Sequence, residues 1–228
     1  MTETEWRMCP DPIAMLIDLR GRASDRKFRL FACACARRVE DWTERRFEAD
    51  AVAVAERMAD GLASSREIEG ARAAFPADDR SAAGWWQMPA LDEDAYAAAT
   101  RASQMAWQAA EWAHSYDESR KRQRIAAARP RAVKYHTARE EDAAVTTVVR
   151  EVFGNPFLPA PFDPRWRTTD VTGVARGIYD DRAFDRFPIL TDALLDAGCD
   201  SEMVLAHCRG TGPHVRGCWV IDLVLGRA

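Results

Sequence analysis

The chain has 228 residues, of which 47% are hydrophobic and 30% charged, a composition typical of a globular protein. The formal net charge of −4 gives no overall electrostatic case for nucleic-acid binding. No stretch reaches the roughly 20 uncharged apolar residues of a membrane helix, and the acidic start with Glu3 and Glu5 is unlike a secretory signal. We therefore expect a cytoplasmic protein with no membrane partner, whose cysteines stay reduced.

Helix start and stop signals recur along the chain, and no alternating pattern is long enough to predict a strand. Asp11 before Pro12 is typical of an N-cap followed by proline at the first helical position. Ser64 and Glu67 have the spacing of a capping box. These signals predict helices over about 11–21, 24–39, 44–60, 64–76, 92–112, 140–153, 169–180, 188–198, 200–208 and 214–225.

The expected fold is mostly α: an irregular multi-helix bundle with a compact C-terminal helical module. The predicted division is an N-terminal helical lobe over 1–116, a basic linker or mobile segment over 117–139, and the C-terminal helical module over 140–228. Cys33 and Cys35 fall on the apolar second helix, about 200° apart around it, and are expected in the core.

The segment 117–139 carries eight basic side chains and only two acidic ones, and Pro130 interrupts any helix there. It offers phosphate contacts to a nucleic acid, but aromatic residues for base stacking are scarce, so a solvated surface is the plainer interpretation. Trp85 and Trp86 lie in a turn-rich stretch, where they are either an anchor for a partner protein or a plug in the core.

Several sequence runs resemble a family of bacterial proteins known mostly from planctomycetes. The N-terminal runs are ASDRKF (23–28) and FACACARR (31–38), and the C-terminal runs include FGNPF (153–157), LAHCR (205–209) and GPHVRGCWVIDLVLG (212–226). The resemblance covers roughly residues 1–62 and 150–228. Some relatives occur beside modules such as repeat-companion domains, which implies a regulatory, interaction or toxin-immunity setting. The resemblance implies no catalytic residue.

Thiol and imidazole side chains are dense near the C-terminus. Thiolates and imidazoles are zinc ligands, and four of them make a closed structural site. The spacing matches no standard zinc module, and adjacent helical residues point about 100° apart, so the alternative is that the cysteines are small buried core residues. The candidate metal ligands are Cys199, His207, Cys208, His214 and Cys218.

The loop from Arg209 to Arg216 contains two glycines and is expected to precede a helix. Backbone N–H groups, a helix N-terminus and two arginines together are typical of an anion site, with His214 as a further binding residue. The simpler interpretation is that Gly210 ends one helix and Pro213 begins the next.

No nucleophile, base and acid are apparent as a set, so the sequence favours a non-enzymatic protein-interaction or regulatory module whose partner is another protein. This interpretation needs no cofactor. One alternative is a metal-binding protein or enzyme that uses the His207–Cys218 segment, with zinc as the ion. The other alternative is a nucleic-acid binder that uses the segment 117–139.

Overall fold

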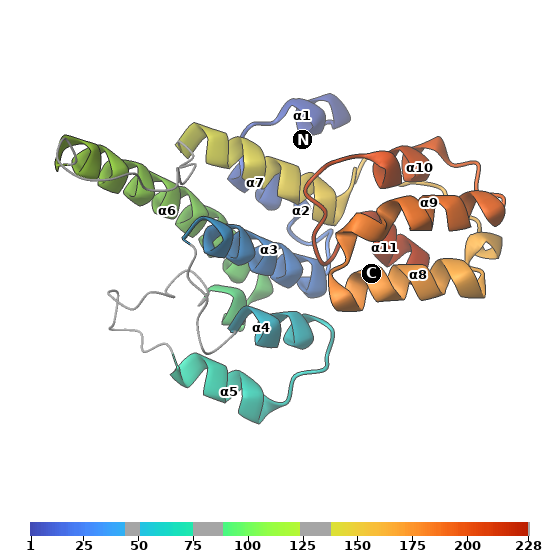
Figure 1. The fold of residues 1–228 in the computed structure, drawn as a ribbon, viewed down its shortest axis with the longest axis horizontal. Coiled ribbons are helices and arrows are strands. Elements are labelled where there is room, and N and C mark those ends of the chain that lie inside the picture. The colour runs from blue at the N-terminus through green and yellow to red at the C-terminus, as the bar shows by residue number, and fades with distance from the viewer. Residues whose placement is uncertain (44–50, 75–88, 124–137, 228) are drawn as a thin grey trace. The chain divides into compact units, whose positions relative to one another are not determined.

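The computed structural model describes residues 1–43, 51–74, 89–123 and 138–227. These residues form eleven α-helices and three short 3-10 helices, and no strand occurs among them, which confirms the mostly α prediction (Figure 1). The chain divides into two compact units. The terminal unit comprises Met1–Met8 and Thr147–Ala228, and the central unit comprises Cys9–Thr146. Within the described ranges, no helix combines the length and apolarity needed to cross a bilayer.

The central unit is built around α3 (Asp25–Thr43), which packs against α6 (Ala95–Gln123) and α4 (Ala51–Ala59). The predicted apolar face of α3 is buried, including Phe28, Phe31 and Cys35, and the side chain of Cys33 is buried as well. Alanines on α6 face this core, and their small side chains allow the two helices to approach closely.

The remaining helices of the central unit begin where the sequence predicts. The carboxylate of Asp11 accepts the backbone N–H groups of residues 13 and 14 at the start of α2 (Pro12–Leu19). Ser64 and Glu67 form the predicted capping box at the start of α5 (Ser65–Ala73). These local signals hold because each satisfies backbone donors that the first helical turn leaves without partners.

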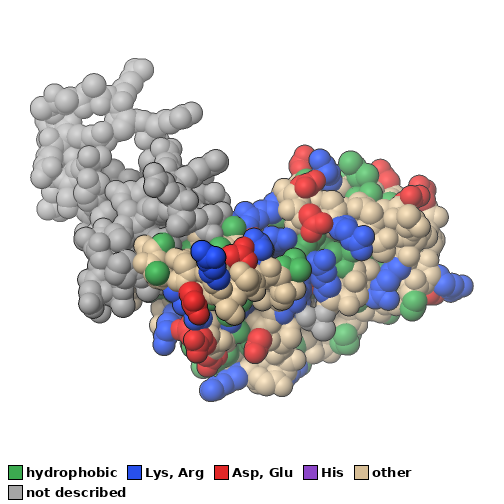
Figure 2. All heavy atoms as spheres, turned by 90° about the horizontal axis from the view of Figure 1, so that it is seen from below, with side chains coloured by type: hydrophobic (Ala, Val, Ile, Leu, Met, Phe, Trp, Pro, Cys, Tyr) green, Lys and Arg blue, Asp and Glu red, His purple; other side chains and the backbone are tan. Residues whose placement is uncertain are grey.

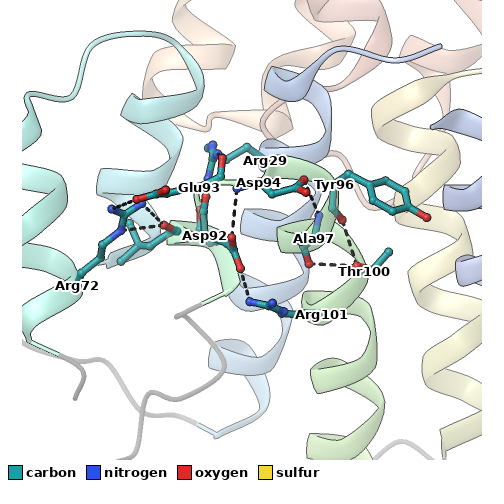
Figure 3. A network of polar contacts seen from close by, with 11 residues as sticks. Arg29, Arg72, Asp92, Glu93, Asp94, Tyr96, Ala97, Thr100 and Arg101 are labelled. Carbon is teal, nitrogen blue, oxygen red and sulfur yellow. Dashed lines mark hydrogen bonds and ion pairs between the residues drawn. The ribbon is translucent and has the colours of Figure 1, made fainter. Parts of the chain in front are cut away.

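Two arginines hold the turn that leads into α6 (Figure 3). Arg29, only 5% exposed, donates to the backbone carbonyls of Ala90, Asp92 and Glu93 at 2.9, 2.6 and 3.2 Å. Arg72 donates twice to the carbonyl of Leu91, at 3.1 and 2.8 Å. We call this arrangement the arginine clasp. Its guanidinium groups are engaged by backbone oxygens, so it is a structural device that positions the start of α6.

The terminal unit combines the N-terminal helix α1 (Glu3–Met8) with the end of α7 (Ala138–Phe153) and four C-terminal helices. The core side chains come mainly from α8 (Thr169–Asp181), α9 (Phe187–Asp196), α10 (Glu202–Arg209) and α11 (Trp219–Leu225). Figure 1 shows these four helices gathered together.

Contacts from α7 and the residues after it attach the N-terminus to this unit. Arg150 donates to the backbone carbonyl of Trp6 at 2.9 Å, and Asn155 donates to the carboxylate of Glu3 at 3.1 Å. The Trp6 side chain is buried. The first eight residues therefore belong with the C-terminal half, a division that differs from the predicted boundaries 1–116, 117–139 and 140–228.

Several helices differ from the predictions. The helix α1 was not predicted, because its six residues carry few periodic apolar positions. The helix α6 continues to Gln123, beyond the predicted end near residue 112, so the start of the predicted linker is helical. The last helix begins at Trp219, not at His214.

Candidate metal centre

Four side chains with metal-binding atoms converge inside the terminal unit: Glu151, His207, His214 and Cys218. One ligand atom of each lies within 4.8 Å of the ligand atoms of the other three. The sequence predicted three of these residues as metal ligands. The structure adds Glu151 to them.

The ligands come from α7, from α10 and from the connection between α10 and α11. Glu151 lies in the last turn of α7, and His207 lies near the end of α10. His214 belongs to the connection that follows α10, and Cys218 is the residue that precedes α11. The connection between α10 and α11 is short, so it returns the chain from His207 to Cys218 within eleven residues.

His214 is held from both sides of its imidazole ring. Its Nδ1 lies 3.0 Å from Oε1 of Glu151, and its Nε2 lies 3.2 Å from the backbone carbonyl of Gly210. The ring also stacks on Phe187, with ring centroids 3.9 Å apart. A histidine whose Nε2–H donates to a carbonyl presents the lone pair of Nδ1 to a metal, which is the usual arrangement of a metal-bound histidine.

His207 contacts two other members of the cluster through one nitrogen. Its Nε2 lies 3.1 Å from Sγ of Cys218 and 3.4 Å from Oε2 of Glu151. Its Nδ1 accepts the indole N–H of Trp219 at 3.1 Å. In this arrangement Nδ1 carries no proton, so the proton of the neutral ring is on Nε2, facing the thiol and the carboxylate.

The buried carboxylate of Glu151 is compensated by the two histidines. Its side chain is 6% exposed, and burial acts to raise its pKa. The hydrogen bonds with His207 and His214 outweigh burial and hold the pKa of Glu151 below its usual value. Burial acts to lower the pKa of His214, but the hydrogen bond and charge of Glu151 raise it overall. Glu151 and His214 therefore stabilise each other's charged forms.

Cys218 is a buried thiol. Its side chain lies in the apolar core of the unit, and burial followed by the nearby charge of Glu151 raises its pKa well above the usual value. A nucleophilic cysteine needs an exposed, electropositive setting that lowers its pKa. The geometry therefore argues against cysteine catalysis here, and a metal ion is the species that stabilises a thiolate at such a place.

The other two predicted cysteine ligands do not join the cluster. Cys199 and Cys208 belong to the apolar core of the terminal unit, which agrees with the alternative interpretation that they are core residues. Burial is the main cause that raises the pKa of Cys208 to about 12. His207 and Cys208 diverge because adjacent residues on a helix point about 100° apart.

Glu151 was missed because it lies 56 positions before His207, and sequence spacing carries no information about such a distant ligand. A signal was nevertheless present. Glu151 stands three residues after Val148 and immediately before Val152, and all three side chains are buried. A carboxylate on the apolar face of a helix requires a buried partner, because an isolated charge there is costly.

The predicted anion loop is organised differently from the expectation. The helix expected to begin at Pro213 begins at Trp219, so the predicted helix N-terminus at Pro213 is wrong. Arg209 approaches Glu202 at 3.7 Å, and the guanidinium of Arg216 lies 4.5 Å from the ring centroid of Tyr179. The two arginines therefore have separate contacts, and anion binding by Arg209 and Arg216 stays a prediction.

Two other predicted binding features fall wholly or largely outside the described residues. Trp85 and Trp86 lie within 75–88, which the structure does not describe, and most of the basic segment 117–139 lies within 124–137. On the face shown in Figure 2, basic and acidic side chains of the described residues are interspersed. This face of the described part therefore offers no single-sign area of the kind that nucleic-acid binding uses.

Comparison with protein families finds no match to this chain. Comparison with curated proteins finds no match either. No solved structure matches. The resemblance to the planctomycete family therefore stays a prediction, and the functional argument rests on the geometry of the four-residue cluster.

Proposed function

We propose that the terminal unit binds one zinc ion through Glu151, His207, His214 and Cys218, and that the ion has a structural role. The observation that carries the proposal is the convergence of four ligand atoms, one from the last turn of α7 and three from residues 207–218, within 4.8 Å of one another. Convergence of a carboxylate, two imidazoles and a thiol in one buried place is the donor set of a transition-metal centre.

The shorter distances within the cluster are close to those of a zinc site. Zinc bonds of about 2.0–2.3 Å in tetrahedral geometry place neighbouring ligand atoms roughly 3.3–3.6 Å apart. The distances from Nε2 of His207 to Oε2 of Glu151 and to Sγ of Cys218 are 3.4 and 3.1 Å. The distance from Nδ1 of His214 to Oε1 of Glu151 is 3.0 Å. The 3.4 Å distance already matches a tetrahedral edge, and the two shorter ones would open by a few tenths of an ångström. The widest separation in the cluster, at most 4.8 Å, would have to close by up to about 1.5 Å.

The charges also suit a divalent ion. A carboxylate and a thiolate contribute two negative charges, and two neutral imidazoles contribute none, so a divalent cation leaves the buried centre neutral. Sulfur and nitrogen donors favour zinc over the oxygen-seeking ions calcium and magnesium.

A structural role is supported by the low solvent exposure of the ligands and by their number. The side chains of Glu151, His207 and His214 are 6%, 16% and 8% exposed. Four protein ligands leave no coordination position for a substrate, which is the arrangement of structural zinc sites. The ion would link α7, α10 and α11 and so hold together the last third of the chain.

The wider role that we propose is that of a non-enzymatic interaction or regulatory module whose partner is another protein. It is supported by the closed character of the centre and by the setting that the family resemblance implies. On this proposal the zinc ion stabilises the unit that carries the interaction.

The test is metal analysis of the full chain, purified without chelator, combined with cobalt substitution. We expect one zinc per chain, and we expect cobalt to give the intense charge-transfer absorption of a thiolate ligand. Cys218→Ala should lose both signals. Cys208→Ala is the matched control, since it removes an equally buried thiol of the same core and should keep both. Absence of zinc and cobalt binding by the wild type, or equal loss in both variants, would contradict the proposal.

A further inference from the structure

The side chain of Trp219 contacts His207, one of the ligands of the proposed zinc centre. Its indole N–H donates to Nδ1 of His207 at 3.1 Å, and the two rings lie 4.9 Å apart between centroids. The indole nitrogen can donate a hydrogen bond but cannot accept one. The contact therefore requires that Nδ1 of His207 carries no proton.

Metal binding requires the reverse arrangement at the same ring. A neutral imidazole has one N–H group, so when Nε2 binds the ion, the proton lies on Nδ1. The Nδ1–H of His207 and the indole N–H of Trp219 would then be two donors aimed at each other. His214 has no such conflict, because its Nε2 faces the carbonyl of Gly210.

We infer that metal binding and the Trp219–His207 hydrogen bond exclude each other, so that loading of the centre displaces the indole of Trp219. This inference rests on the proposed zinc function and adds a conformational consequence to it. The metal-free form keeps the indole on His207, and the loaded form releases it.

The surroundings of Trp219 limit how it can move. Gly154 has a φ of +66°, and a Cβ built there would lie 3.2 Å from Cγ of Trp219, so one side of the ring is closed by backbone. The side chain is half-buried, which leaves a path toward solvent. Because Trp219 is the first residue of α11, its release alters the start of that helix and the surface next to it. The surface of the terminal unit next to α11 would therefore differ between the loaded and the metal-free centre.

The first test follows Trp219 directly during zinc addition. The full chain, labelled with 5-fluorotryptophan, has eight tryptophans, and the fluorine resonance absent from Trp219→Phe identifies Trp219. We expect that resonance to move to a new position as zinc is added, and the resonance of Trp166, assigned in the same way, to stay in place. A Trp219 resonance that stays in place while zinc binds would overturn the inference.

The second test measures zinc affinity by competition with a chelating dye. In Trp219→Phe zinc binding no longer has to break the hydrogen bond to His207. The variant should therefore bind zinc about tenfold more tightly than the wild type, the order expected from one hydrogen bond. Trp166→Phe is the matched control in the same unit and should leave the affinity unchanged. Circular dichroism checks that the variants fold, and Trp219→Tyr, which also lacks the indole N–H, replaces Trp219→Phe if that variant does not.

The two proposals fail in different ways. If the wild type binds no zinc, the proposed function fails and the inference fails with it. If the wild type binds zinc but Trp219→Phe binds it equally or more weakly, only the inference fails.

Discussion

Glu151→Gln is the substitution that most directly tests the electrostatics of the cluster. It keeps the size of the side chain but removes the charge that two buried histidines face. Glu151 approaches Nδ1 of His214 at 3.0 Å and Nε2 of His207 at 3.4 Å. A hydrogen bond to a charged group contributes about 1.5–3 kcal/mol, so we expect the free energy of unfolding of the terminal unit to fall by about 2–3 kcal/mol. In a domain of 60–100 residues, that loss lowers Tm by at least about 8 °C.

Glu141→Gln is the control, because Glu141 is also buried and lies on the same helix, in the part that belongs to the central unit. The carboxylate of Glu141 pairs with Arg38 at 2.9 Å, yet burial outweighs this pairing and raises the pKa of Glu141. The pKa of Glu151 is lowered instead. A raised pKa means that the fold favours the neutral carboxyl, which glutamine imitates, so Glu141→Gln should lose less stability than Glu151→Gln.

The assay is urea unfolding at pH 7 with chelator present, followed by circular dichroism and repeated with excess zinc. In chelator, Glu151→Gln should lose more stability than Glu141→Gln. At a zinc concentration of 100 times Kd, the wild type and Glu141→Gln should each gain about 2.7 kcal/mol, and Glu151→Gln should gain far less. Equal losses by the two variants in chelator would refute the electrostatic reasoning, and equal zinc stabilisation would refute Glu151 as a ligand.

Three further substitutions test the architecture. Gly154→Ala should destabilise the terminal unit by more than the roughly 1–2 kcal/mol of left-handed backbone strain, because the new Cβ also meets Trp219. The control is Gly21→Ala, where φ is +75° and no atom lies near the new Cβ, so thermal unfolding should show the backbone strain alone. Arg29→Met should cost about 3 kcal/mol in urea unfolding, since three backbone carbonyls lose their donor, and a loss below about 1 kcal/mol would contradict the arginine clasp. Ser64→Ala should cost about 1 kcal/mol and speed hydrogen exchange at the start of α5, whereas unchanged exchange at the Glu67 amide would contradict the capping box.

Local chemistry made the helices predictable. Asp11 and Ser64 cap helices through bonds to residues within three positions of them, so the sequence alone contains the whole interaction. Predictions from the sequence were weaker for elements whose position depends on tertiary contacts. The short helix α1 is anchored by Arg150, more than 140 residues away, and no local pattern contains that contact.

The ligands of the candidate metal centre also depend on tertiary contacts that no local sequence pattern contains. The C-terminal cysteines and histidines were recognisable by donor chemistry, but their spacing did not separate ligands from core residues. Cys208 stands beside His207 and yet lies in the core, while Glu151 stands far away and contacts both histidines. The direction in which each side chain points from the backbone decides whether a residue joins the cluster or the core.

By itself, the sequence determined the helical class, most helix starts and the region in which metal-binding atoms are concentrated. These properties depend on composition, periodicity and bonds between near neighbours. The tertiary structure decided which donors converge, placed the N-terminus in the terminal unit, and set Trp219 against His207. Such pairings depend on how separate helices pack, and a buried charge such as Glu151 obtains its partners only when those helices meet.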